Sequence, residues 1–343
     1  MFRVPTLASR LLPSFALSAL LAIGAAGVAV AQDDDPGTGE PVPLTVGLGY
    51  IPSVQFAQFY LADEAGYYED AGLDVTFENK IDPELITLLA RGAVDIGMAD
   101  GTSVIPAVSQ GIPVRYGATI YGRDPNVVFS LGGSGIESAT DLAGASIGIP
   151  GRYGSSWVAL QALLASAGLT PDDAVITTYP DFGQAVAVDA GRVDAATGFV
   201  NNEPVQLALR GQEVNVLRVS DVAPLPGPGL VAGVDTLETK GEALAAFTTA
   251  TIRAMEEISA DPVVGLEAAL ARVPELAEDP ETQLAILEAT IDSWMGEHAA
   301  EHGLGAVDRD SWESGLEIMR SLPGSTVSDE ITVDDLVTDA LRS

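Results

Sequence analysis

Short apolar runs alternate with longer segments of helical character along the chain from Leu44 onward. The apolar runs predict buried strands, and the segments between them predict helices. This order is typical of an α/β protein whose sheets are open, mainly parallel and flanked by helices. Strands are expected at 44–49, 73–78, 94–99, 114–120, 145–150, 174–179 and 194–199. Helices are expected at 55–71, 82–91, 102–110, 154–167 and 182–190, followed by a C-terminal segment from about residue 240 that is nearly all helical.

Two similar phrases, Arg91–Ala99 (RGAVDIGMA) and Ala190–Gly198 (AGRVDAATG), lie about 99 residues apart. In each, a helix is expected to end at glycine, the chain turns, and a strand begins. The repetition predicts two similar lobes, each with its own open sheet. We expect residues 44–130 plus 230–343 to form lobe I and residues 131–229 to form lobe II, with the chain crossing between them near 130–141 and 222–233. The second crossing contains Pro224-Leu-Pro-Gly-Pro-Gly229, which cannot be helical.

The first 31 residues have the pattern of a secretory signal peptide. Arg3 and Arg10 accompany an apolar run at 11–30, and Ala29-Val30-Ala31 offers a small-x-small cleavage site. The alternative is a retained membrane anchor, because the apolar run approaches spanning length. We expect cleavage after Ala31, a flexible Pro/Gly linker at 32–43, and a location in the periplasm or at the extracytoplasmic surface.

Composition narrows the classes of partner and of chemistry. With 49 acidic and 16 basic residues the formal net charge is −33, which argues against nucleic acid and anionic membranes as partners. The chain has no cysteine, which excludes disulfides, thiolate metal sites, cysteine nucleophiles and a lipid-modified N-terminal cysteine. The manner of retention at the cell surface and the habitat behind the acidic surface are left open by the sequence.

Four motifs occur in one order: Gly49–Phe56 (GYIPSVQF), Gly92–Gly97 (GAVDIG), Gly151–Trp157 (GRYGSSW) and Asn201–Pro204 (NNEP). Together they resemble the solute-binding subunits of ABC importers, in the branch that includes thiamine-pyrimidine-precursor, alkanesulfonate and riboflavin binders. Within it the chain is most similar to the riboflavin-binding type, over about residues 44–300. The resemblance implies a two-lobed periplasmic binding protein fold of type II, hinge closure, and delivery to an ABC permease in the membrane. It also implies a vitamin as the transported ligand, with no cofactor, and we expect a monomer.

Ligands of open α/β sheets bind beyond the carboxyl ends of the strands, so side chains at those positions are the candidates. A planar heteroaromatic ligand needs aromatic neighbours for its faces and polar groups for its edge. In lobe I the candidates are Tyr50, Gln55, Phe56, Tyr60, Asp100, Ser103 and Tyr121. The alternatives are a core position for Tyr60 and helix capping for Gln55 and Ser103.

In lobe II the glycines of the GRYGSSW motif permit close backbone approach at the start of a helix, whose free amides attract electronegative groups. The Asn-Asn-Glu run after an apolar strand suits a ring amide edge or a polyhydroxyl tail, with helix capping as the alternative. The lobe II candidates are Tyr153, Ser155, Ser156, Trp157, Asp181, Phe182, Asn201, Asn202 and Glu203.

The favoured function is therefore capture of a flat vitamin, above all riboflavin, without catalysis. One alternative is a binder of a thiamine pyrimidine precursor of the formylaminopyrimidine type. Another is a zinc-dependent hydrolase, because His298-Ala-Ala-Glu301-His302 matches the H-x-x-E-H pattern. A third is a structural or adhesion module that binds no small molecule. A eukaryotic relative makes thiamine pyrimidine with iron and a cysteine-rich motif, and that chemistry is not expected in a chain without cysteine.

Overall fold

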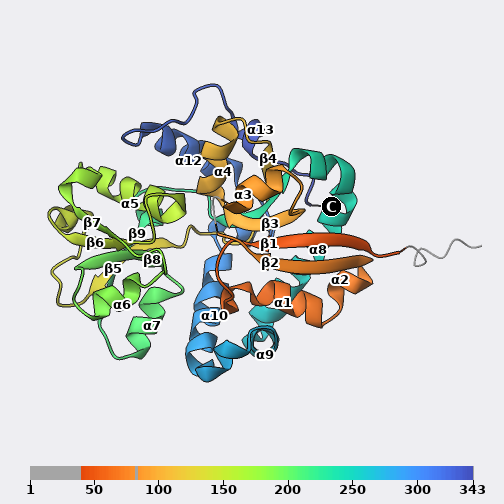
Figure 1. The fold of residues 1–343 in the computed structure, drawn as a ribbon, viewed down its shortest axis with the longest axis horizontal. Helices are drawn as coiled ribbons and strands as arrows, with labels where there is room; N and C mark the ends of the chain where they lie inside the picture. Colours follow the sequence, from red (N-terminus) through yellow and green to blue (C-terminus); the bar gives the residue numbers. More distant parts are fainter. Residues whose placement is uncertain (1–39, 82–83, 343) are drawn as a thin grey trace, which may run out of the picture. The chain divides into compact units, whose positions relative to one another are not determined.

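The computed structural model describes residues 40–81 and 84–342, which belong to a compact unit that comprises residues 39–343 (Figure 1). The predicted signal peptide at 1–31 and all but the end of the predicted linker lie outside the described residues. The predicted end of the linker at residue 43 is wrong, because β1 begins at Val42, whose backbone pairs with Leu73.

The strands in the described part of the chain form two five-stranded mixed sheets (Figure 1). The first has the order β2-β1-β3-β10-β4, and β10 runs antiparallel to both of its neighbours. The second has the order β7-β6-β8-β5-β9, with β5 as the antiparallel strand. The strands are β1 (Val42–Leu48), β2 (Leu73–Asn79), β3 (Ile96–Asp100), β4 (Val114–Thr119), β5 (Asn126–Leu131), β6 (Ser146–Ile149), β7 (Val175–Thr178), β8 (Ala195–Phe199), β9 (Val214–Arg218) and β10 (Pro228–Gly233).

Helices flank both sheets, and the part of the chain after β10 is mostly helical, as predicted. Pro262 and Pro280 each open a helix, and the preceding aspartates Asp261 and Asp279 cap the first turn. The α-helices are α1 (Ala57–Glu64), α2 (Tyr67–Asp70), α3 (Glu84–Ala90), α4 (Gly101–Ser109), α5 (Gly154–Ser166), α6 (Gln184–Asp189), α7 (Glu203–Leu209), α8 (Val234–Ala260), α9 (Pro262–Arg272), α10 (Pro280–Trp294), α11 (Glu297–His302), α12 (Arg309–Ser321) and α13 (Val333–Leu336). The short 3-10 turns are η1 (Val54–Phe56), η2 (Ala139–Leu142), η3 (Pro171–Asp173), η4 (Val219–Asp221) and η5 (Pro274–Glu278).

The sequence did not predict β5, β9 or β10, and two of these strands, β5 and β10, lie beside the crossings between the sheets. β5 pairs in the second sheet, so the chain changes sheet at residues 120–125 and not at the predicted 130–141. The second predicted crossing contains β10, which lies between β3 and β4 of the first sheet. Proline occupies only the first position of this strand, and Gly229 is required because a Cβ there would collide with the Ala118 carbonyl oxygen. The Pro/Gly-rich segment therefore contains a central strand of the first sheet, although its composition is typical of a loop.

The two similar phrases occupy equivalent places in the two sheets. Asp95 precedes β3 and accepts a hydrogen bond from the Thr45 amide at 2.9 Å, while its own amide donates to the Thr45 carbonyl. Asp194 precedes β8 and accepts from the Ser146 amide at 2.8 Å in the same reciprocal arrangement. The Val-Asp pair thus ties the start of one strand to its parallel neighbour in both sheets.

Replacing Asp95 by alanine should destabilise the protein more than replacing Asp194. Asp95 also forms a 2.8 Å ion pair with Lys240, whose Nζ atom donates to the Pro43 carbonyl, whereas Asp194 has no basic partner among the described residues. We expect a loss of about 2–3 kcal/mol for Asp95→Ala and about 1 kcal/mol for Asp194→Ala, because the first change strands a partly buried cation. Urea denaturation of both variants measures this difference, and equal losses would contradict the role given to Lys240.

Candidate ligand-binding site

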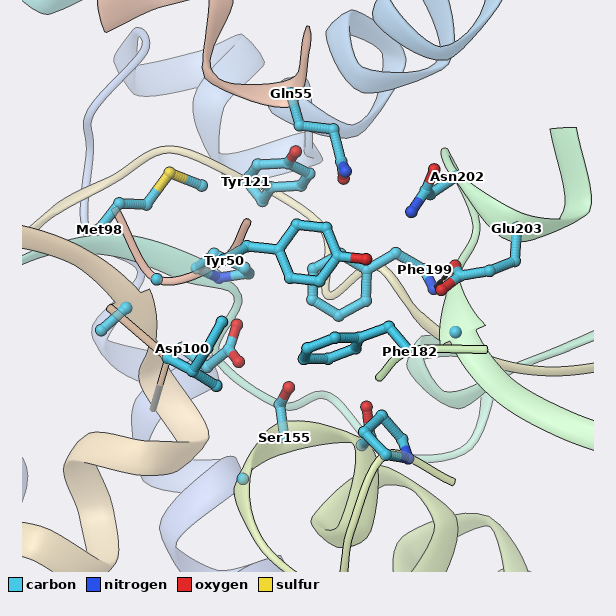
Figure 2. A pocket seen from close by; sticks show the side chains of 18 of the residues that line it. Tyr50, Gln55, Met98, Asp100, Tyr121, Ser155, Phe182, Phe199, Asn202 and Glu203 are labelled. Carbon is cyan, nitrogen blue, oxygen red and sulfur yellow. Dashed lines mark hydrogen bonds between the residues drawn. The ribbon is translucent and has the colours of Figure 1, made fainter. Parts of the chain in front are cut away.

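A cavity lies where the carboxyl ends of β1 and β3 from the first sheet meet those of β6 and β8 from the second (Figure 2). Its empty space, counted with the open mouth, is about 910 Å³. The lining includes eleven residues that the sequence singled out: Tyr50, Gln55, Phe56, Asp100, Tyr121, Tyr153, Ser155, Ser156, Phe182, Asn202 and Glu203.

Aromatic side chains from both sheets meet inside this cavity. The rings of Tyr50 and Phe182 approach edge to face, with their centroids 4.9 Å apart and an interplanar angle of 82° (Figure 2). Tyr50 follows β1, and Phe182 lies just before α6 with a φ of +58°, a region that costs energy for a bulky side chain. The strained backbone conformation of Phe182 therefore turns its aromatic ring into the cavity.

Two carboxyl groups face the cavity from opposite sheets (Figure 2). Desolvation raises the pKa of Asp100 to about 6, and a hydrogen bond from the Ser155 hydroxyl partly opposes that rise. Desolvation likewise raises the pKa of Glu203 to about 7, although its Oε2 atom accepts a 2.9 Å hydrogen bond from the Phe199 amide. Burial and the nearby Glu203 charge both raise the pKa of Tyr50, while a hydrogen bond with Asn202 opposes them. These groups can recognise both donors and acceptors at the edge of a ring.

Asn201 does not line the cavity but connects the two sheets behind it. Its side chain is fully buried, and Nδ2 donates to Gln55 Oε1 at 2.9 Å and to Thr290 Oγ1 at 2.8 Å. Gln55 belongs to η1 and Thr290 to α10, whereas Asn201 follows β8 of the second sheet. The amide therefore links the loops of the two sheets through buried hydrogen bonds, which cost energy when they are broken.

Two further predicted residues of the first sheet's loops lie outside the cavity. Tyr60 is 4% exposed and packs edge-on against Phe77 in the core, which matches the alternative given for it. Ser103 is buried within α4, and neither it nor Asp100 caps that helix through its side chain. Tyr60 and Ser103 both lie on helices, and the helical period turns their side chains toward neighbouring elements and away from the cavity. The prediction used only their distance in sequence from a strand end, which does not give the direction of a side chain on a helix.

Trp157 and Asp181 also lie outside the cavity. The Trp157 ring packs against an apolar cluster on one turn of α5, and the Arg152 guanidinium lies 5.0 Å from its centroid. The Asp181 carboxylate accepts a hydrogen bond from the Gly183 amide at 3.2 Å, so it shapes the turn that carries Phe182. Trp157 follows Ser155 and Ser156 on the helix, and the rotation of about 100° per residue points it away from them.

The sequence prediction missed several lining residues. Met98 and Phe199 lie at the carboxyl ends of β3 and β8, so the rule that selected Tyr50 could have selected them too. Gln184 opens α6 and donates from Nε2 to the Thr197 carbonyl at 3.3 Å, and its buried Oε1 atom has no hydrogen-bond partner in the structure. The remaining lining residues are Gly49, Ile81, Ala99, Pro150, Gly154, Gly198 and Pro228.

The H-x-x-E-H motif forms α11, a six-residue helix that does not contribute to the cavity. The His298 and His302 rings lie 4.4 Å apart, His298 Nδ1 lies 3.9 Å from an Asp308 carboxylate oxygen, and the Glu301 side chain is 78% exposed. Residues 40–81 and 84–342 contain no group of three or more side chains arranged to hold a metal ion. Among the same residues no helix is both long and apolar enough to cross a membrane.

Comparison with known proteins places this geometry in a family. The model of the family described as NMT1/THI5 like matches residues 53–264, more than half of the chain. The chain belongs to this family. It is 34% identical to the riboflavin-binding protein RibY of Chloroflexus aurantiacus over 282 residues, covering 81% of this chain and 80% of RibY. It is 28% identical to a formylaminopyrimidine-binding protein of Halalkalibacterium halodurans, covering 79% of this chain and 82% of that protein.

Solved structures confirm the predicted fold class. The alkanesulfonate-binding protein SsuA from Xanthomonas axonopodis pv. citri superposes with a TM-score of 0.65 at 16% identity, covering 84% of this NMT1/THI5-like chain and 97% of SsuA. The fold is thus the two-lobed α/β fold of periplasmic binding proteins, although its sheets are mixed. The chain is also 27% identical to a Saccharomyces cerevisiae protein named 4-amino-5-hydroxymethyl-2-methylpyrimidine phosphate synthase, covering 69% of this chain and 73% of that protein.

Proposed function

We propose that this chain is the solute-binding subunit of an ABC importer and that it captures riboflavin between its two sheets. The observation that carries the proposal is the cavity in which Tyr50 and Phe182 meet from opposite sheets, with polar groups around them. A flat ring system gains both dispersion and quadrupole interactions from such aromatic neighbours. The similarity to RibY, named as a riboflavin-binding protein, supports this ligand.

In this proposal, the isoalloxazine ring lies against Tyr50 and Phe182, while Asp100, Ser155 and Glu203 bond its polar edge or the ribityl tail. Asn202 holds the Tyr50 hydroxyl. The buried bonds of Asn201 to Gln55 and Thr290 stabilise the closed arrangement of the two lobes, so that occupancy and closure are coupled.

The cellular setting is part of the same proposal. Lobe I contains the first sheet and lobe II the second, and the chain crosses between them at residues 120–125 and again before β10 begins at Pro228. The chain is exported, loses its first 31 residues, acts as a monomer and delivers its ligand to a membrane permease. In this proposal the chain binds its ligand without catalysis, and the two histidines of the H-x-x-E-H motif lie on α11, outside the cavity.

A thiamine pyrimidine precursor is the second candidate ligand, supported by the similarity to the formylaminopyrimidine-binding protein. Carboxyl groups such as Asp100 and Glu203 can accept hydrogen bonds from the amino group of a pyrimidine. The higher identity to RibY, 34% against 28%, favours the flavin.

Titration of ligand-free, refolded protein with riboflavin tests the proposal. We expect flavin fluorescence to be quenched by the adjacent aromatic rings, with saturation at about one equivalent, and the melting temperature to rise through ligand linkage. Formylaminopyrimidine should give a weaker thermal shift, and the sulfonate buffer MOPS should give none. Absence of both quenching and a thermal shift with riboflavin would remove it as the ligand, and a shift with the pyrimidine alone would favour the second candidate.

A further inference from the structure

The ionisable residues that line the cavity affect whether it can bind an anionic form of a vitamin. Among the described residues that line the cavity, Asp100 and Glu203 are the carboxylic acids, and no lysine, arginine or histidine is present. Much of the lining is apolar, and repulsion between like charges is screened less beside such surface than in open water. An anionic ligand would therefore bring its charge toward two carboxyl groups without a cation to balance it.

Basic residues that adjoin lining residues in the sequence are held elsewhere. Lys80 lies 3.7 Å from a Glu78 carboxylate oxygen, on the strand side of Ile81. Arg152 stacks on Trp157 outside the cavity, and Arg123 is exposed beyond Tyr121. None of these three side chains contributes to the lining.

The start of α5 would be the natural place for an anion, because Gly154, Ser155 and Ser156 line the cavity at a helix N-terminus. In this structure a carboxyl group of the protein faces it instead. The Ser155 hydroxyl donates a hydrogen bond to Asp100, which belongs to the opposite sheet. The favourable end of the helix dipole is therefore already used by an acidic side chain.

We propose that Asp100 and Glu203 determine specificity by rejecting phosphorylated forms of the ligand, so that the site accepts riboflavin and excludes riboflavin 5′-phosphate. This inference rests on the proposed function for the identity of the ring. It also places the protein after a hydrolytic reaction: a phosphate monoester must be cleaved to the free alcohol before this site can take it up. Specificity of this kind arises as much from repulsion of the wrong ligand as from contacts to the right one.

The test is the ratio of dissociation constants for riboflavin 5′-phosphate and riboflavin, measured by calorimetry at pH 8. We expect the wild-type protein to bind the phosphate at least about 100-fold more weakly. The Asp100→Asn and Glu203→Gln double variant should reduce that ratio to about 10-fold or less, because the repulsion is removed while the shape is kept. Asp172→Asn is the matched control, since this exposed carboxylate of η3 does not line the cavity, and it should leave the ratio unchanged.

Equal binding of the two flavins by the wild-type protein would overturn the inference. A ratio that persists in the double variant would also overturn it, because the exclusion would then be steric. If neither flavin binds, the proposed function fails, and the same ratio is measured with 4-amino-5-hydroxymethyl-2-methylpyrimidine and its phosphate. Rejection of that phosphate would support the inference independently of riboflavin, whereas equal binding, or binding of neither compound, would overturn it.

Discussion

Replacing Tyr50 by alanine should lower the affinity for riboflavin by about 100-fold, which is the size expected for a central aromatic contact in an enclosed site. The ring supplies one face of the cavity and meets Phe182 edge to face at 4.9 Å. Tyr50→Phe should cost less than about 10-fold, because it keeps the ring and removes only the hydroxyl that bonds Asn202. Fluorescence titration of both variants measures the two losses.

Tyr67→Ala is the matched control for this experiment. Tyr67 contacts Glu257 and has the Arg253 guanidinium 3.6 Å from its ring centroid, and it does not line the cavity. Its removal should leave the affinity unchanged within about twofold, because remote surface changes are nearly neutral. An equal loss in Tyr50→Ala and Tyr67→Ala, or no loss in either, would contradict the location of the site.

Raising the pH from 5.5 to 8 should lower the melting temperature of the ligand-free protein by several degrees, with Asp124 as a main cause. Asp124 is 7% exposed in the segment 120–125 between the two sheets. Its Oδ1 atom accepts a 2.7 Å hydrogen bond from Asn126, but its buried Oδ2 atom has no hydrogen-bond partner in the structure. Desolvation accordingly raises the pKa of Asp124 from 3.8 to about 7.

The sign follows from proton linkage. Between pH 3.8 and about 7 the folded protein keeps a proton on Asp124 that the unfolded chain has released, so stability falls as the pH rises through this window. Between pH 5.5 and about 7, the titration of Asp124 lowers the free energy of unfolding by about 2 kcal/mol. The raised pKa values of Asp100 and Glu203 act in the same direction. Hydrogen bonds lower the pKa of several exposed aspartates, whose contribution is lost only as the pH falls below their ordinary value, outside this range.

Asp124→Asn should remove about 2 kcal/mol of this pH dependence and stabilise the protein at pH 8, because the neutral amide keeps an acceptor for Asn126 without a buried charge. Asp173→Asn is the control, since hydrogen bonds from Thr170 lower the pKa of this exposed carboxylate and place its titration below the range. Melting temperatures at pH 5.5 and 8 measure the slope. A slope that is unchanged in Asp124→Asn would contradict the assignment.

The positions at strand ends were predictable because the rule that selects them is local. A buried strand is recognised from a short apolar run, and its last residues point past the edge of the sheet. Tyr50 and Asp100 were found in this way, and the same rule would have found Met98 and Phe199. Tyr60 and Trp157 were placed wrongly at the cavity, because the direction of a side chain on a helix depends on which neighbours that helix packs against.

The sequence by itself determined the alternation of strands and helices, the repeated Val-Asp turn and the aromatic and carboxyl groups that gather at the cavity. Each of these follows from local periodicity or from a residue's distance to a strand end. Only the tertiary structure decided that β5 joins the second sheet and that β10 is a central strand of the first. It also decided that Asn201 connects loops of the two sheets and that no described cation lines the cavity. Those features depend on backbone pairing and burial between residues far apart in the chain. No local pattern encodes such contacts, and in β10 the proline and glycines even suggest a loop.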